Sequence, residues 1–280
     1  MELALGHMET GMEHWTYAPL LAYLVSCLGC GLGLACTSRA WVGTRAIRNL
    51  WLAWSAVSIG GTGVWAMHFI AMVGTTVEGS EVSWNIPLTA LSLLIAVGIV
   101  AVGMFVVGYS RAKLPALLLA GLLTGVGVAA MHYTGMAAMQ VQGSIHYDMR
   151  IVALSVVIAV VAATAALWVT RDVRSKLAMA GAIPIMALAV SGMHYTGMAA
   201  AGFTMDHSAP APTGAGVLSL TWPLIIWIGG CPVITLMLIA LVPSGKEALE
   251  DRYHQEIFDQ LSRQRQATQR PDPTYGIDRT

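Results

Sequence analysis

Three histidines occur in three copies of one short sequence, each near the end of an apolar run. The copies are Ala66-Met-His-Phe-Ile-Ala-Met72, Ala130-Met-His-Tyr-Thr-Gly-Met-Ala-Ala-Met139 and Gly192-Met-His-Tyr-Thr-Gly-Met-Ala-Ala200. An imidazole inside a hydrophobic segment is costly to place, so a chain that places three in the same local sequence is expected to use them.

A methionine follows each histidine by four residues, and on a helix this spacing puts both side chains on one face. Neutral imidazole and thioether form a ligand set that suits copper, and the soft sulfur favours Cu(I). Haem is the alternative, because His and Met also bind haem iron. Zinc is less favoured, since no carboxylate lies in these runs. The predicted metal ligands are His68, Met72, His132, Met136, His194 and Met198.

Other side chains of the motifs are expected to pack around the ligands or hydrogen-bond to them. The methionine before each histidine lies about 100° away around a helix, and Met139 falls seven residues after His132 on the same predicted stripe. The upstream positions of these stripes, such as Gly61 with Val64 and Gly125 with Val128, are expected to face the bundle centre. The predicted surrounding residues are Met67, Met131, Met193, Tyr133, Tyr195, Trp65 and Met139.

The three histidines also share a predicted depth. They follow the last basic residue of the preceding loop by 20, 19 and 18 residues, counting from Arg48, Lys113 and Lys176. At 1.5 Å per residue each rise is about 27 to 30 Å, which brings the imidazoles to one height near the far membrane face. A single membrane histidine is more often a hydrogen-bond partner between helices, but three at matched depth favour a shared site.

The composition is that of an integral membrane protein. The 280 residues are 56% hydrophobic and only 11% charged, with no net charge. No basic stripe is present, so the sequence predicts no nucleic-acid partner. Seven apolar runs are long enough to span a bilayer: Tyr17–Cys36, Leu50–Val73, Ile86–Val107, Leu114–Met139, Ile151–Val169, Leu177–Ala201 and Leu220–Val242.

Basic residues of the loops predict the orientation. Eight lie in the loops after spans one, three and five, against one in the opposite loops. Basic loops stay cytoplasmic, so the N-terminus is predicted outside and the C-terminus inside. The fold class is therefore an all-α membrane protein of seven transmembrane helices.

The motif spacing indicates duplication. His68, His132 and His194 are 64 and 62 residues apart, which predicts three tandem two-helix repeats with the seventh helix outside them. The predicted division is an extracytoplasmic segment over 1–16, a membrane domain over 17–243 and a charged cytoplasmic tail over 244–280. Leu249, Tyr253, Ile257 and Leu261 predict a short amphipathic helix ending before Pro271. The N-terminal segment offers candidates for metal capture, namely His7, Met8, Met12 and His14.

With these copies in view, the chain resembles the MHYT family of bacterial membrane proteins over roughly residues 15–243. Copies two and three keep Met-His-Tyr-Thr at 131–134 and 193–196, whereas copy one has Phe69 and Ile70 in place of Tyr and Thr. The resemblance implies a bacterial inner-membrane sensor that binds copper near the outer face and detects O2, CO or NO. In that family the module is often joined to GGDEF and EAL domains that make or break cyclic di-GMP.

The expected function is a membrane sensor, with two alternatives. The tail is too short for a catalytic output domain of ordinary size, so we expect a stand-alone module that signals to a separate cytoplasmic partner. The first alternative is a copper-handling or transport protein, indicated by the Met/His-rich N-terminal segment. The second is a membrane metallo-oxidoreductase, but the spans lack carboxylates for a proton relay, and we expect no enzyme activity.

Overall fold

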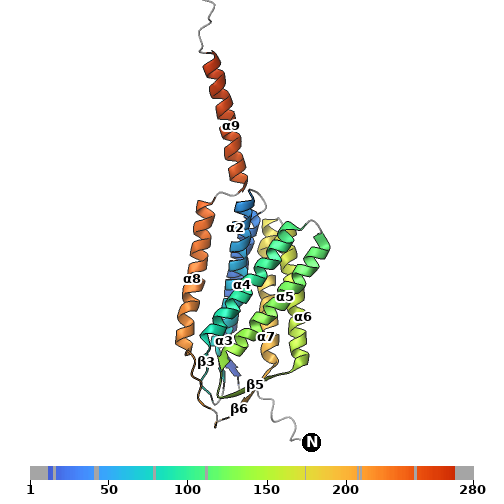
Figure 1. Cartoon of the computed structure of the whole chain (residues 1–280), viewed down its shortest axis with the longest axis vertical. Coiled ribbons are helices and arrows are strands. Elements are labelled where there is room, and N and C mark those ends of the chain that lie inside the picture. Colours follow the sequence, from blue (N-terminus) through green and yellow to red (C-terminus); the bar gives the residue numbers. More distant parts are fainter. Residues whose placement is uncertain are drawn as a thin grey trace, which may run out of the picture.

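The computed structural model describes residues 12–14, 17–40, 44–77, 80–110, 113–173, 175–206, 208, 210–242 and 245–268. Seven helical segments of this part are long and apolar enough to cross a membrane, as predicted. They form a bundle, from which the last helix extends as a separate rod (Figure 1). In chain order they are α1 (Ala18–Ala40), the composite Arg45–Val73, α4 (Ile86–Tyr109), α5 (Lys113–Ala138), α6 (Met149–Asp172), α7 (Lys176–Ala199) and α8 (Val217–Leu241), and the rod is α9 (Gly245–Thr268).

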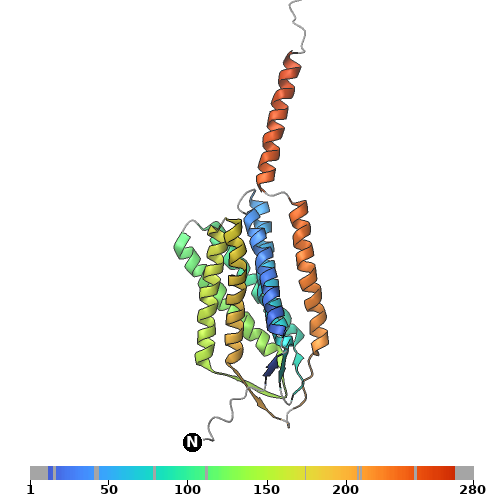
Figure 2. The same ribbon diagram turned by 180° about the vertical axis from the view of Figure 1, so that it is seen from behind.

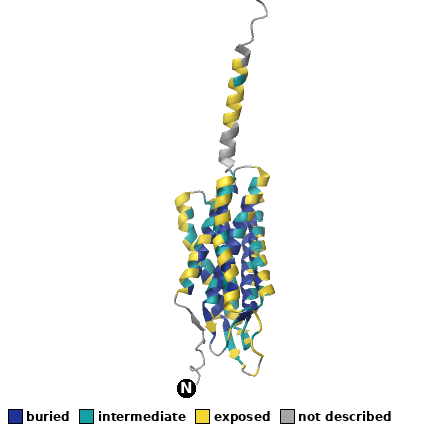
Figure 3. Cartoon of the chain, turned by 90° about the vertical axis from the view of Figure 1, so that its left-hand side faces the viewer, coloured by how far each residue is buried: buried dark blue, intermediate teal, exposed yellow. Residues whose placement is uncertain are grey.

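Burial follows the pattern expected in a bilayer. Large apolar side chains such as Leu94 and Ile226 lie on the outside of the bundle, where they are 69% and 70% exposed. The centre is filled by buried residues, which Figure 3 shows as a dark core inside an exposed surface. In a bilayer the backbone polar groups find no water, and continuous apolar spans of 23 to 29 residues satisfy them by forming helices.

The three predicted repeats share one construction. In each, a short strand leads into a helix pair, and the second helix leaves directly into a strand that pairs antiparallel with the first. The pairs are β1 (Met12–His14) with β2 (Thr75–Val77), β3 (Ser83–Trp84) with β4 (Met139–Gln140), and β5 (Gly143–Tyr147) with β6 (Ala201–Met205). The sequence pattern did not predict these strands. All three sheets gather at the end of the bundle opposite α9, called the strand end below (Figure 1).

The apolar pattern predicted a single α-helix for the second span, but the structure differs. The span consists of α2 (Arg45–Ala56), a π-helix η1 (Val57–Ala66) and α3 (Met67–Val73). A π-helix turns more slowly per residue, so counting by 100° fails upstream of His68. Gly61, predicted to face the bundle centre, instead lies against the Trp227 ring of α8. Gly125 of α5 likewise meets α6 at Val160 rather than the centre.

Glycines allow η1 to approach α1 closely. A Cβ placed on Gly29 would lie 2.1 Å from the backbone nitrogen of Gly63 and 2.8 Å from the carbonyl oxygen of Ser58. Backbone atoms cannot rotate away, so this contact requires glycine. Close approach through small residues is a common way to pack helices in a bilayer.

Replacing Gly29 by leucine is therefore expected to separate α1 from η1 and to lower the free energy of unfolding by about 3 kcal/mol, the upper part of the range for overpacking. Thermal unfolding of the detergent-solubilised protein, followed by tryptophan fluorescence, measures the effect. Gly98→Leu is the matched control, because Gly98 is exposed on α4 and a Cβ there meets nothing within 4 Å. Equal melting temperatures for the two variants would contradict the close packing.

Candidate metal centre

The structure brings the three histidines together at the strand end. His68 comes from α3, His132 from α5 and His194 from α7, and each is at most 1% exposed. Their Nδ1 atoms form a triangle with sides of 3.0 Å (His68 to His194), 3.2 Å (His68 to His132) and 3.3 Å (His132 to His194). The rings meet edge to face, with centroids 4.9 to 5.1 Å apart.

Hydrogen bonding among the imidazoles cannot satisfy this triangle. The Nδ1 atom of an imidazole either donates one hydrogen or accepts through one lone pair. With three nitrogens and two states, at least one pair must be two donors or two acceptors, which repel each other. Protonation adds donors and does not remove the conflict. A cation between three lone pairs removes it completely.

The spacing also fits a metal ion. Nitrogen ligands bind at about 2.0–2.1 Å, which places two nitrogens of one tetrahedral ion about 3.3 Å apart. The observed sides of 3.0 to 3.3 Å agree with that value. Among the described residues, these three histidines form a group whose possible ligand atoms all lie within 4.8 Å of one another. The three histidines can therefore hold one metal ion.

Two glycines that the sequence pattern did not single out fix the rings. A Cβ on Gly135 would lie 2.4 Å from Nε2 of His68, and one on Gly197 would lie 2.3 Å from Nε2 of His132. Neither Nε2 atom has a hydrogen-bond partner in the part of the chain that the structure describes. The imidazoles are thus positioned by packing against a glycine of the next repeat. The signal was present in the motif, since a glycine follows the histidine by three residues in copies two and three.

The methionines four residues after each histidine are buried. Met72, Met136 and Met198 are 0%, 0% and 3% exposed, so the sulfur atoms lie within the protein and not toward lipid. That these three methionines bind a metal stays a prediction. Met139 was predicted to lie on the same helical stripe as His132. Instead α5 ends at Ala138, and Met139 pairs with Trp84 in the β3–β4 sheet.

The methionines before the histidines are buried as well. Met131 and Met193 belong to the main core, whereas Met67 packs with Ala22 of α1 and Ala71 in a separate cluster. Their exposed fractions are 1% for Met67 and Met131 and 2% for Met193. Their contacts are those of helix packing.

The predicted aromatic neighbours take different positions. Tyr133 and Tyr195 each lie against the histidine that precedes them, with ring centroids 4.8 and 4.9 Å apart. The Tyr133 hydroxyl is 2.7 Å from the Ser155 Oγ of α6. Trp65 instead faces α4, where its Nε1 donates to the Ser92 Oγ at 3.0 Å.

The candidates for metal capture are only partly placed. His7 and Met8 lie outside the described residues. Met12 and His14 lie in β1, whose backbone pairs with β2 at Val77 and Thr75 respectively. This pairing places the start of the first repeat beside the strand that leaves the His68 helix.

Known proteins provide an independent comparison. The family described as "Bacterial signalling protein N terminal repeat", MHYT, matches residues 61–120 and 125–182. The bifunctional diguanylate cyclase/cyclic di-GMP phosphodiesterase MucR of Pseudomonas aeruginosa is 40% identical over 196 residues, which are 68% of this chain and 27% of MucR. The cyclic di-GMP phosphodiesterase NbdA of the same organism is 35% identical over 75% of this chain and 28% of NbdA.

A more distant relative is the signaling protein YkoW of Bacillus subtilis, 29% identical over 83% of this chain and 30% of YkoW. The chain therefore spans less than a third of the length of these curated relatives. No solved structure matches. The repeated motif, the seven spans and these similarities lead to one conclusion: the chain belongs to the MHYT family of bacterial membrane signalling proteins.

Proposed function

We propose that this chain is a sensor module of the bacterial inner membrane that binds one copper ion through His68, His132 and His194 near the outer membrane face. The observation that carries the proposal is the triangle of three buried Nδ1 atoms with sides of 3.0 to 3.3 Å. Without a cation, at least one pair of these Nδ1 atoms must be two donors or two acceptors. The distances between the nitrogens also match those of ligands on one metal ion. The matched family is described as a repeat of bacterial signalling proteins, and YkoW is a signaling protein by name, which supports a sensory role over a purely structural one.

The surroundings favour a singly charged ion. A buried charge is costly unless it is compensated, and the cost rises steeply with the charge. The buried polar residues described are Ser, Thr and His, with no Asp or Glu among them. Cu(I) carries a single charge and accepts imidazole and thioether ligands, so it is the ion we propose. Met72, Met136 and Met198 would supply sulfur from the same three helices.

Haem suits this arrangement less well. Axial ligands of haem stand on opposite faces of a wide macrocycle, but these Nδ1 atoms lie within 3.3 Å of one another. Transport is also less favoured, because the cavity on the α9 side of the cluster is lined almost entirely by apolar side chains and offers an ion no polar path. An oxidoreductase would need a proton relay, for which the buried residues described provide no carboxylate.

Three nitrogen ligands leave a copper ion able to accept a further ligand, for which a gas molecule would compete with the methionine sulfurs. The chemistry that bound Cu(I) would supply is reversible binding of O2, CO or NO, and the role of the chain is to hold the three nitrogens and exclude water. Gas binding can shift a conformational equilibrium only if it favours one helix packing over another. The output would go to a separate cytoplasmic partner or to a segment that follows α9.

A continuous set of contacts leads from the site toward α9. His68 is the second residue after the end of η1, and π-helical segments occur often at functional sites. Trp65 of η1 packs edge-on against Trp227 of α8, with centroids 6.1 Å apart. Trp54 of α2 donates to Thr235 of α8 at 2.7 Å. A change in the position of His68 would therefore act on the helix that precedes α9.

Purified protein in lipid nanodiscs, reduced and titrated with copper, is expected to retain one Cu(I) per chain against the chelator bicinchoninate. X-ray absorption at the copper edge would then show nitrogen ligands from imidazole, and a sulfur contribution would support the methionines. Added CO should produce one infrared band in the region of copper carbonyls. Copper bound at no more than trace levels would overturn the proposal, and bound copper without a carbonyl band would overturn its gas-binding part.

A further inference from the structure

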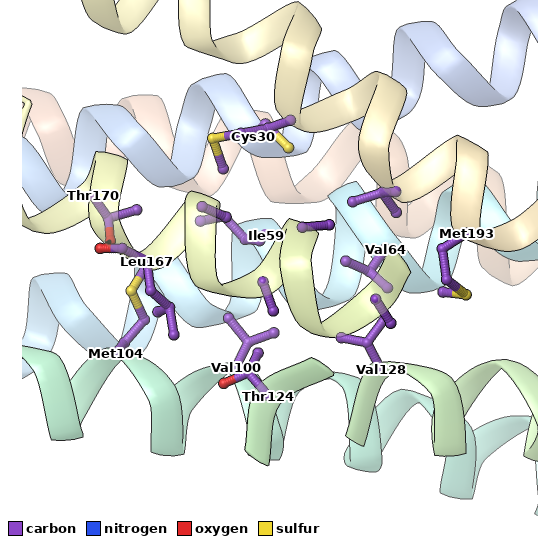
Figure 4. A pocket seen from close by; sticks show the side chains of 16 residues that line it. Cys30, Ile59, Val64, Val100, Met104, Thr124, Val128, Leu167, Thr170 and Met193 are labelled. Carbon is purple, nitrogen blue, oxygen red and sulfur yellow. Dashed lines mark hydrogen bonds between the residues drawn. The ribbon is translucent and has the colours of Figure 1, made fainter. Parts of the chain in front are cut away.

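An apolar cavity lies on the α9 side of the histidine cluster. It has a volume of about 60 Å³ and is lined by side chains of α1, η1, α4, α5, α6 and α7 (Figure 4). Among the described residues that line it, Thr124 and Thr170 carry hydroxyl groups, and the Thr170 hydroxyl already donates to the carbonyl oxygen of Leu167 at 2.9 Å. A buried water needs two to four polar partners, so this cavity is suited to an apolar occupant.

One end of the cavity adjoins the histidines. Val64, Val128 and Val190 all line it, and each precedes a histidine of the cluster by four residues. Met193, the neighbour of His194 in sequence, lines the same end (Figure 4). This end of the cavity therefore lies about one helical turn from the imidazoles and carries one valine from each repeat.

The other boundary of the cavity adjoins the lipid-facing surface. A groove of about 470 Å³ lies between α6 and α7, and it shares Ala162, Ala166 and Met186 with the cavity. Alanine and glycine predominate along the groove, and Ile185 and Trp168 at its rim are 69% and 49% exposed. Met186 is 7% exposed and has a flexible, unbranched side chain. A shift of this side chain would join the groove to the cavity.

We propose that this cavity binds a small apolar molecule, of the size of a diatomic gas, which enters from the hydrocarbon core of the bilayer through the α6–α7 groove. Apolar solutes partition into hydrocarbon in preference to water, so access from the side samples a higher concentration than access through the strand end. From the cavity the molecule then passes between Val64, Val128 and Val190 to the histidine cluster. This last step rests on the proposed metal site, whereas occupancy of the cavity does not.

Xenon tests occupancy without any metal. In protein with 13C-labelled methionine methyl groups, xenon pressure is expected to shift the signals of Met104 and Met193, which line the cavity, in a saturable manner. Met131 and Met136 are the internal controls, because they are equally buried and do not line it. Shifts at Met104 and Met193 no larger than those of the controls would overturn the cavity as a binding site.

Two variants with opposite effects test the route. Ala166→Phe is expected to block the groove and slow CO association with the copper-loaded protein several-fold, and Met186→Ala is expected to accelerate it. Ala153→Phe is the matched control, because Ala153 is exposed on α6 and lines neither space. Unchanged rates in both variants would overturn the route.

If xenon binds but copper does not, the proposed function fails and the cavity stands. If copper binds CO but xenon leaves Met104 and Met193 unaffected, the cavity proposal alone fails.

Discussion

Alanine in place of any one of His68, His132 or His194 is expected to abolish stoichiometric Cu(I) binding. The remaining two nitrogens would still converge, but the buried ion would lose one of its three imidazole ligands in surroundings that offer no carboxylate among the described residues. Loss of one of the three imidazole ligands should lower copper affinity by well over the roughly 10- to 100-fold that outer contacts contribute. Competition with bicinchoninate measures this affinity for each variant.

Two controls accompany these variants. His254→Ala changes an exposed histidine on α9, far from the cluster, and should leave copper affinity unchanged. Thermal unfolding of the metal-free variants separates loss of the site from loss of the fold. Each cluster variant relieves a repulsive pair but leaves a cavity in place of the buried ring, so the metal-free variants should stay folded with melting temperatures no higher than that of the wild type. Full copper retention by all three variants would contradict the site.

The shared position of the histidines could be predicted from the sequence because it depends on regular geometry. Each imidazole follows the last basic loop residue by a nearly constant count, and a helix converts that count into depth. The position of Val128 at the central cavity also follows from helical spacing along α5. Local periodicity was sufficient wherever the helix remained regular and the contact was with the bundle centre.

The rest depended on contacts between segments distant in sequence. The π-helix η1 is a local departure that an apolar run does not reveal, and it turns Gly61 toward Trp227. Met139 looked helical by spacing, but pairing with Trp84 ended the helix one residue earlier. Trp65 is a predicted neighbour of the site, and the hydrogen bond that its indole donates to Ser92 of α4 could not be predicted from the sequence.

The seventh span illustrates the same limit at the level of the fold. Its apolar run predicted a helix and its lack of a motif placed it outside the repeats, and both are confirmed. The sequence did not indicate its partners. α8 stands at the edge of the bundle (Figure 2), and its Trp227 and Thr235 contact the composite second span. The helix that leads to α9 therefore packs on the span that carries His68.

Gly197→Ala is expected to weaken Cu(I) binding by about 10- to 100-fold while leaving the fold intact, the range seen when groups that orient metal ligands are removed. The added methyl carbon would lie 2.3 Å from Nε2 of His132, so the imidazole must move and its Nδ1 leaves the triangle. In a helix interior, alanine is itself favoured over glycine by roughly 1 kcal/mol, which offsets part of the strain. The variant should thus lose affinity without a large change in melting temperature.

The chain offers a matched control on the same helix. A Cβ on Gly192 of α7 would meet nothing within 4 Å, so Gly192→Ala should keep wild-type copper affinity. Gly135→Ala should behave like Gly197→Ala, because its methyl carbon would lie 2.4 Å from Nε2 of His68. Equal affinities for the Gly197 and Gly192 variants would show that the histidine rings are not positioned by these glycines. A loss in both motif variants, with the control unchanged, would assign the glycine of the Met-His-Tyr-Thr-Gly sequence to the metal centre.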